Sequence, residues 1–263
     1  MPTNIDTMYE RKYQLERFTA LLGAKKAGEL INEKQYLSPG HLTPKGDGIF
    51  STWKSATFFY ANAVPQWNVR RTSSAFILIS NKIFQNLQTI VSGNWEKIES
   101  LTRAIAKALM EDIIVIQGTL NELSLLNEHN ELRIISLEEN KTVVPLWMWK
   151  IVKSPSRNAG IAFVILNNPS VETMVDSQLP CTNICHQTGW DEKLGLEPKK
   201  GFTICCDPNM LIRAVSHAPD KGSVRNILNQ DILSSAAARF SERLSSVLIA
   251  LAVTISSLLL LFW

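Results

Sequence analysis

The sequence predicts an α+β fold in one main domain, with a central antiparallel sheet and flanking helices. Two stretches with helical spacing and several short apolar segments of strand length support this prediction. The length supports it as well, since 263 residues that are 45% hydrophobic can bury a substantial core. We place a domain at residues 1–215, a polar linker at 216–243 and an apolar tail at 244–263.

The helices are predicted from apolar residues at steps of three and four, over about residues 9–30 and 95–110. The strands are predicted from short runs rich in apolar, β-branched and aromatic residues. Residues 127–130, Asn-Glu-His-Asn, are expected to form a turn between two strands. The predicted strands lie at residues 56–64, 113–116, 132–137, 144–152 and 161–166, and residues 36–48 are expected to be extended chain and turn.

The composition excludes several classes of protein and limits the role of charge. A formal net charge of +3 gives no broad basic surface, so binding of nucleic acid would depend on a local site. Collagen, a coiled coil, a disordered chain and a polytopic membrane protein are excluded by the residue content.

All four cysteines lie in one short region, as Cys181, Cys185 and the adjacent pair Cys205 and Cys206. We expect disulfides in preference to a zinc site, because three residues between two cysteines and a vicinal pair are poor spacings for zinc ligands. Four cysteines allow three pairings, and the spacing does not choose among them. Disulfides favour an oxidising compartment, and the acceptor sequence at Asn140 for N-glycosylation is compatible with secretion.

The two ends of the chain lead to different expectations. Residues 244–263 carry no charge and would form a helix of about 30 Å. Small residues, a polar spacer and this tail have the layout of a GPI-attachment signal, with a tail anchor and a buried terminal helix as alternatives. The first 13 residues lack the apolar segment of a signal peptide. Because a GPI signal requires entry into the secretory pathway, we expect the natural N-terminus to be missing.

Three segments, in this order, resemble the DNA/RNA non-specific endonuclease family, whose sites have a ββα-metal fold. Residues 36–42, YLSPGHL, resemble the motif around the histidine of that family. Residues 57–67, TFFYANAVPQW, resemble its strand with the N-x-x-P-Q segment, and residues 93–99, GNWEKIE, resemble its metal-binding helix. Further segments that resemble the secreted arthropod branch lie at residues 144–150, 167–169 and 200–206, so that the resemblance covers about residues 9–210.

The resemblance implies an enzyme that hydrolyses phosphodiester bonds in DNA and RNA with Mg²⁺ or Mn²⁺. It assigns His41 as the general base, because a neutral imidazole can take a proton from water near neutral pH. It assigns Asn62 as a polar residue of the site and Glu99 as the acid that orders the waters of the metal. In the family an asparagine four residues before the tryptophan binds the metal. An arginine two residues before the histidine contacts phosphate.

Two positions depart from this pattern. Val91 stands where the family has its metal-binding asparagine, and a valine offers no oxygen to a cation. Pro39 stands where the family has its arginine, and a proline has no guanidinium for phosphate. Asn94 and Asn86 are the nearby residues that we consider as substitute ligands.

An insertion separates the second segment from the third. Its surplus, at about residues 68–85, would lie between the strand and the helix of the site. It is either a surface loop, which costs little closure entropy, or a retained intron.

Two hypotheses about function follow. The first is a secreted or membrane-tethered nuclease, with the membrane reached through the tail or a GPI anchor. The second is a catalytically inactive homologue that binds nucleic acid or a protein partner. His41, Asn62 and Glu99 favour the enzyme, whereas Val91 and Pro39 favour the inactive homologue.

Overall fold

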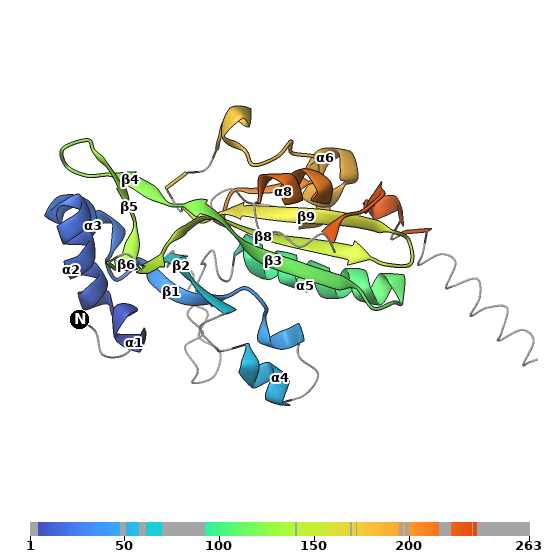
Figure 1. Cartoon of the computed structure of the whole chain (residues 1–263), viewed down its shortest axis with the longest axis horizontal. Coiled ribbons are helices and arrows are strands. Elements are labelled where there is room, and N and C mark those ends of the chain that lie inside the picture. Colours follow the sequence, from blue (N-terminus) through green and yellow to red (C-terminus); the bar gives the residue numbers. More distant parts are fainter. Residues whose placement is uncertain are drawn as a thin grey trace, which may run out of the picture.

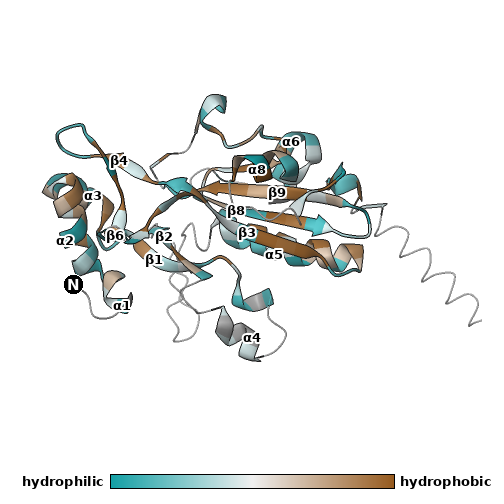
Figure 2. Ribbon diagram, viewed as in Figure 1, coloured by the Kyte–Doolittle hydropathy of each residue, from teal (hydrophilic) through white to brown (hydrophobic). Residues whose placement is uncertain are grey.

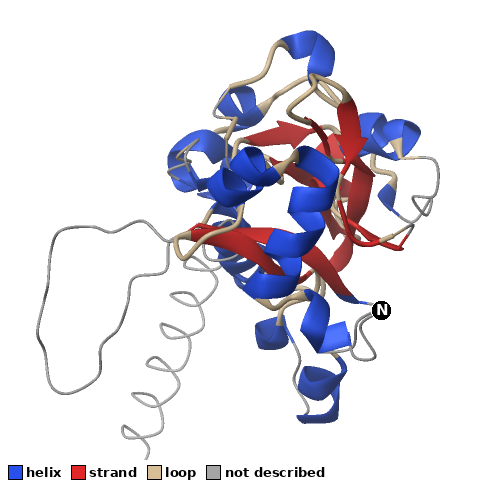
Figure 3. Ribbon diagram, turned by 90° about the vertical axis from the view of Figure 1, so that its left-hand side faces the viewer, coloured by secondary structure: helices blue, strands red, loops and turns tan. Residues whose placement is uncertain are grey.

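The protein is an α+β molecule in which helices pack on both sides of an antiparallel sheet, as predicted (Figure 1). Figure 3 shows this arrangement from the side. The computed structural model describes residues 5–47, 51–57, 62–69, 93–139, 141–168, 170–171, 173–194, 197, 200–215, 222–232 and 234–235.

The N-terminal region consists of α1 (Ile5–Met8), α2 (Arg11–Leu22) and α3 (Ala24–Leu30). The prediction of one helix over 9–30 is therefore wrong at Gly23. This glycine has φ +90°, and a Cβ at this position would collide with the carboxylate of Glu128. The positive φ ends one helix and starts the next, which apolar spacing does not indicate.

The first sheet is a hairpin of β1 (Gln35–His41) and β2 (Ala63–Val69), with His41 opposite Ala63. The buried amide of Gln14, on α2, both donates to and accepts from the backbone of Leu37, each over 2.8 Å. The helix α2 thus supplies hydrogen bonds to β1 that a neighbouring strand would otherwise supply.

The segment between these strands differs from its prediction. It contains the 3₁₀ turn η1 (Lys45–Asp47) and the helix α4 (Ser51–Ala56). The strand predicted at 56–64 is wrong in its bounds, because pairing with β1 begins only at Ala63. Residues 58–61 lie outside the described residues.

The main sheet has the order β10-β9-β8-β3, and β11 (Asn226–Ile227) pairs with β9 in parallel. All eight residues of β9 (Ala159–Leu166) are buried. Apolar residues dominate this central strand (Figure 2). The neighbours are β8 (Pro145–Ser154), β3 (Ile114–Glu122) and β10 (Thr203–Cys206).

Successive side chains of these strands point to opposite faces of the sheet, so the sheet separates two hydrophobic cores. Met148 and Val152 of β8 belong to the first core, which α5 (Asn94–Leu109) covers. Trp147, Trp149 and Ile151 belong to the second core on the opposite face. The remaining helical elements are η3 (Asp176–Gln178), α6 (Cys185–Thr188), α7 (Trp190–Leu194) and α8 (Pro208–Ala214), the last of which contributes Leu211 to the second core.

Two small hairpins complete the described strands. The turn expected at residues 127–130 connects β4 (Ser124–Leu126) to β5 (Leu132–Ile134), which confirms that prediction. The second hairpin is formed by β6 (Ser136–Glu138) and β7 (Lys141–Val143).

Two disulfides confirm the expectation from the cysteines. Cys181 is bonded to Cys206, and Cys185 is bonded to Cys205. Because Cys205 and Cys206 are adjacent on β10, their side chains point to opposite faces of the sheet. The bond at Cys205 lies in the first core and the bond at Cys206 in the second.

Asn167 connects the β1–β2 hairpin to the main sheet. Its fully buried amide donates to the carbonyl oxygens of Pro65 (2.9 Å) and Pro145 (3.0 Å). Its oxygen accepts from the backbone nitrogen of Trp67 over 3.2 Å. One side chain therefore holds β2 against the start of β8.

Several sequence predictions fall outside the described residues. They concern Val91, Asn86, nearly all of the insertion at 68–85 and the tail at 244–263. Within the described part of the chain, every helix is too short or too polar to cross a membrane.

Candidate active site

His41 lies at the end of β1, where it is half-buried. The indole Nε1 of Trp95, on α5, donates a hydrogen bond to the carbonyl oxygen of His41 over 3.2 Å. Burial lowers the pKa of the His41 imidazole below its usual value. The imidazole is therefore neutral at neutral pH, as a general base requires.

The residue before this histidine must be small. Gly40 is buried, and the side chain of Gln66 packs directly over its Cα, so that any Cβ at this position would collide with that amide. The glycine thus lets β2 approach β1 closely beside His41.

Asn62 shapes the turn that follows His41. Its oxygen accepts from the backbone nitrogen of Thr43 over 2.9 Å, and its nitrogen donates to the carbonyl oxygens of Thr43 (2.9 Å) and Thr57 (2.8 Å). Both ends of the amide are therefore bound to backbone. In this structure Asn62 positions the chain after the histidine.

Glu99 lies on α5 four residues after Trp95, so both residues share one face of the helix. Burial raises the pKa of this half-buried carboxyl to about 7, against the opposing charge of Lys150. Asp47 contributes to the increase, and Arg103 opposes it. The Glu99 carboxyl therefore changes its charge near neutral pH.

Three charged residues that the sequence analysis missed surround this carboxyl. Arg103, one turn beyond Glu99 on α5, forms an ion pair with Asp47 over 3.1 Å. Lys150 projects from β8 toward the same helix, with its Nζ 5.1 Å from the centre of the Trp95 ring. The i, i+4 step from Glu99 could have identified Arg103. The alternation of the predicted strand at 144–152 could have placed Lys150 on the core face.

The other site predictions have mixed outcomes. Pro39 is exposed, and its side chain lies on the same side of β1 as that of His41. Asn94 is fully buried and donates to the carbonyl oxygens of Glu197 (3.0 Å) and Gly201 (2.6 Å). It lies about 140° around the helix from Glu99, so it does not face the site as a substitute ligand would.

A metal ion would find few direct ligands here. Among the described residues, His, Cys, Asp and Glu nowhere form a group of three that could hold a metal ion. The carboxylates of Glu99 and Asp47 suit a hard cation that keeps most of its waters, because such an ion requires few protein oxygens. The positive charges of Lys150 and Arg103 would oppose the binding of such a cation. The residues therefore fit a mostly hydrated, weakly held ion.

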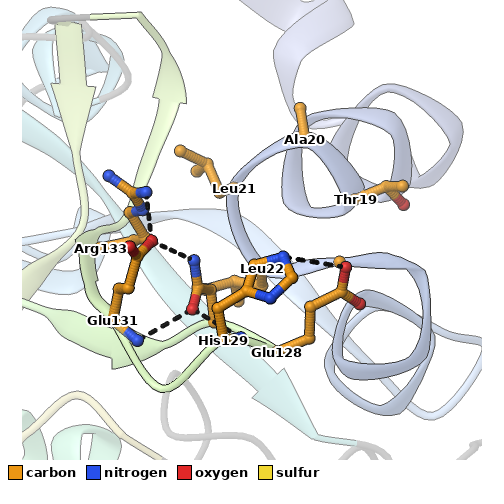
Figure 4. Close-up of a pocket in the computed structure, with 10 residues that line it drawn as sticks. Thr19, Ala20, Leu21, Leu22, Glu128, His129, Glu131 and Arg133 are labelled. Atoms are coloured by element: carbon orange, nitrogen blue, oxygen red, sulfur yellow. Dashed lines mark hydrogen bonds and ion pairs between the residues drawn. The ribbon is translucent and has the colours of Figure 1, made fainter.

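A separate pocket of about 360 Å³ lies between α2 and the β4–β5 hairpin (Figure 4). Arg133 forms an ion pair with Glu131 over 2.5 Å, and the Nε2 atom of His129 lies 3.8 Å from a carboxylate oxygen of Glu128. None of its lining residues belongs to the site around His41. The residues that line it are Thr19, Ala20, Leu21, Leu22, Gly23, Asn127, Glu128, His129, Glu131 and Arg133.

The site thus combines a neutral imidazole with a carboxylate on α5, the helix that binds the backbone of His41. Hydrolases activate water with such groups. Residues 3–209 match the model of the DNA/RNA non-specific endonuclease family, and the chain belongs to this family. The resemblance seen in the three ordered segments is thereby confirmed. The strands β1 and β2 and the helix α5 follow in the order strand, strand, helix, while the ββα-metal site remains a prediction.

Two of the similar proteins are named as salivary proteins. A salivary endonuclease of Lutzomyia longipalpis is 34% identical over 207 residues, which are 77% of this chain and 44% of the relative. The salivary protein Tsal1 of Glossina morsitans morsitans is 25% identical over 226 residues, which are 86% of this chain and 51% of the relative. The chain thus spans about half the length of these relatives.

The chain is also similar to a crystal structure of the EndoG/EndoGI complex, which was solved to describe the mechanism of EndoG inhibition. It has a TM-score of 0.34 and 16% sequence identity, and the match covers 62% of this chain and 60% of that one.

Proposed function

We propose that the protein is a divalent-metal-dependent endonuclease that hydrolyses phosphodiester bonds in DNA and RNA. The hydrogen bond from Trp95 to the carbonyl oxygen of His41 carries this proposal. It joins the end of β1 to the face of α5 that bears Glu99. Membership of the endonuclease family supports the class of reaction.

In the proposed mechanism, the neutral His41 imidazole accepts a proton from the attacking water. Glu99, in its ionised form, would hold the hydrated cation by accepting hydrogen bonds. Mg²⁺ or Mn²⁺, when bound, would neutralise charge on the phosphate and on the leaving oxygen. Arg103 has a half-exposed guanidinium beside Glu99, which would attract a phosphate where Pro39 offers no charge.

The alternative is a catalytically inactive homologue that binds nucleic acid or a protein. Val91 and Pro39 favour it, because these positions supply neither the oxygen ligand nor the guanidinium of the family pattern. A nuclease that binds its metal weakly and hydrolyses its substrate slowly would be intermediate between the active enzyme and the inactive homologue.

The test is cleavage of plasmid DNA and of RNA by the refolded full chain with Mg²⁺ or Mn²⁺. We expect cleavage that His41→Ala abolishes and that His186→Ala, at an exposed histidine, leaves unchanged. Pro39→Arg/Val91→Asn should raise the rate, and deletion of residues 68–85 belongs in the same series. If the wild-type chain is inactive and Pro39→Arg/Val91→Asn restores cleavage, the inactive homologue is correct.

We also propose that the protein is secreted, with tethering to a membrane through the tail or a GPI anchor. The two disulfides and the salivary relatives support secretion. Expression in cultured insect cells of the gene with its natural upstream coding sequence tests this. Protein found in the medium supports secretion, and release from cells by a phospholipase specific for phosphatidylinositol would identify a GPI anchor. Protein confined to the cell interior contradicts both.

A further inference from the structure

The hairpin of β4 and β5 exposes three aliphatic side chains on one of its faces. Leu126 and Leu132 lie directly opposite each other, and Ile134 follows two residues further along β5 on the same face. Their exposed fractions are 47%, 70% and 50%. The hairpin projects at the end of the molecule that holds α2 and α3 (Figure 1). A cluster of exposed aliphatic side chains, unlike a single one, is a sign of an interaction surface.

The outer edge of β5 can accept another strand. Among the strands that the structure describes, only β4 pairs with β5. The backbone nitrogen of Asn127 donates to the carbonyl oxygen of Glu131 over 2.8 Å, which directs the Glu131 carbonyl toward β4. Because backbone groups alternate in direction along an antiparallel ladder, those of Leu132 and Ile134 point away from β4. The strand β5 therefore presents an edge to which a second extended chain can add.

The charges of β5 make this edge complementary to itself. Glu131 and Arg133 flank Leu132 and form an ion pair with each other over 2.5 Å. Their side chains are still 57% and 50% exposed, so both can also contact a partner. When a second copy runs antiparallel with Leu132 opposite Leu132, each glutamate lies opposite the arginine of the other copy. Opposite charges in directly facing positions stabilise a strand pair.

Charge also disfavours the other ways of pairing two copies. A parallel pair in register would place glutamate opposite glutamate and arginine opposite arginine. An antiparallel pair centred on Arg133 would place two arginines opposite each other, and like charges in facing positions are destabilising. The pair centred on Leu132 avoids both conflicts. In it, the outward backbone groups of the two Leu132 residues form two hydrogen bonds with each other.

We propose that β5 pairs antiparallel with β5 of a second copy of this chain, in a symmetric dimer centred on Leu132. The pairing joins two hairpins into one four-stranded sheet and brings the two aliphatic faces side by side. A strand of three residues offers less than the area of about 800 Å² that each partner of a stable complex buries, so the dissociation constant is on the order of 100 μM. This proposal goes beyond the proposed function and does not depend on it.

The first experiment measures association of the full chain by sedimentation equilibrium. We expect a reversible dimer to appear between about 10 μM and about 1 mM. Leu132→Pro should leave the hairpin folded, because the N–H that it removes points away from β4, and should abolish the dimer. Leu15→Ser, at an exposed leucine of α2, is the control and should leave association unchanged.

Two results of this experiment overturn the proposal. One is a wild-type chain that stays monomeric over this range, in which case the edge would suit an extended segment of a different protein. The other is association that Leu132→Pro does not reduce, because the contact would then lie on another surface.

Charge reversal tests the register and does not require the proline variant to fold. Glu131→Lys and Arg133→Glu should each weaken association about tenfold, because each places like charges opposite each other. An equimolar mixture of the two variants should associate as the wild-type chain does, since opposite charges then face each other between the copies. The ion pair within the chain is lost in both variants, so it does not account for recovery in the mixture. A mixture that associates as weakly as each variant by itself contradicts the proposed register.

Discussion

The indole nitrogen of Trp95 donates to the carbonyl oxygen of His41, and this bond connects a helix that covers the main sheet to a strand of another sheet. The backbone of His41 is held from one side by pairing with Ala63 and from the other by this indole. The orientation of the imidazole therefore depends on the packing of α5.

Replacement of this tryptophan tests that dependence. Trp95→Phe should reduce the free energy of unfolding by about 2–4 kcal/mol, because it removes buried volume and leaves the His41 carbonyl without this donor. Trp190→Phe is the matched control, since its indole donates to the carbonyl oxygen of Leu228 over 2.8 Å. Both variants should lose similar stability in urea unfolding. Only Trp95→Phe should alter the His41 titration by NMR, and equal titration curves would contradict the anchoring role.

The lowered pKa of His41 gives stability a defined pH dependence. The unfolded chain binds the proton more readily than the folded chain, so the free energy of unfolding should fall as pH drops through the usual histidine range. It should level off below the folded-state pKa. We expect His41→Asn to lack this contribution in urea unfolding between about pH 5 and pH 8. If the wild-type chain and this variant show the same slope, burial does not lower this pKa.

Removal of the Asn167 amide should loosen the connection between the two sheets. Asn167→Ala leaves two buried carbonyl oxygens and the nitrogen of Trp67 without this partner, which should cost about 3–5 kcal/mol. Asn168→Ala is the neighbouring control, because the side-chain oxygen of Asn168 accepts a hydrogen bond from the backbone nitrogen of Ser170 at the surface. Thermal unfolding compares the two, and similar losses would show that Asn167 is not the specific connection.

The disulfides are expected to contribute comparably to stability. Their sequence separations are 25 and 20, so loss of either bond should cost about 3 kcal/mol. Cys181→Ala/Cys206→Ala and Cys185→Ala/Cys205→Ala measure the two losses by urea unfolding. Peptide mapping without reduction provides the check on pairing, and a bond between Cys181 and Cys205 would contradict the structure.

The sequence predicted the bounds of an element best where apolar residues form a continuous stripe along one of its faces. The stripe of Ile98, Leu101 and Ile105 predicts the helix α5 to within about a residue. Apolar spacing did not predict the break at Gly23, because the spacing is compatible with either sign of φ. The strand predicted at 56–64 was displaced because pairing with β1, a long-range contact, determines where β2 begins.

The candidate site was predictable only where a motif marks it. His41 and Glu99 follow from the spacing of ordered segments. Lys150 does not, because a charged residue in a strand suggests a solvated face, and only burial under α5 reveals its environment. The pairing of the cysteines depends on which strand face each thiol reaches, and local spacing carries no such information.

The adjacent cysteines of β10 have a consequence for the tolerance of this strand to insertions. Cys205 and Cys206 reach opposite cores because one peptide separates them. A single inserted residue before Cys205 would reverse the face of each thiol and break both bonds together. Both disulfides can therefore form only in the observed register of β10, and a shift of the strand by one residue in either direction would prevent both.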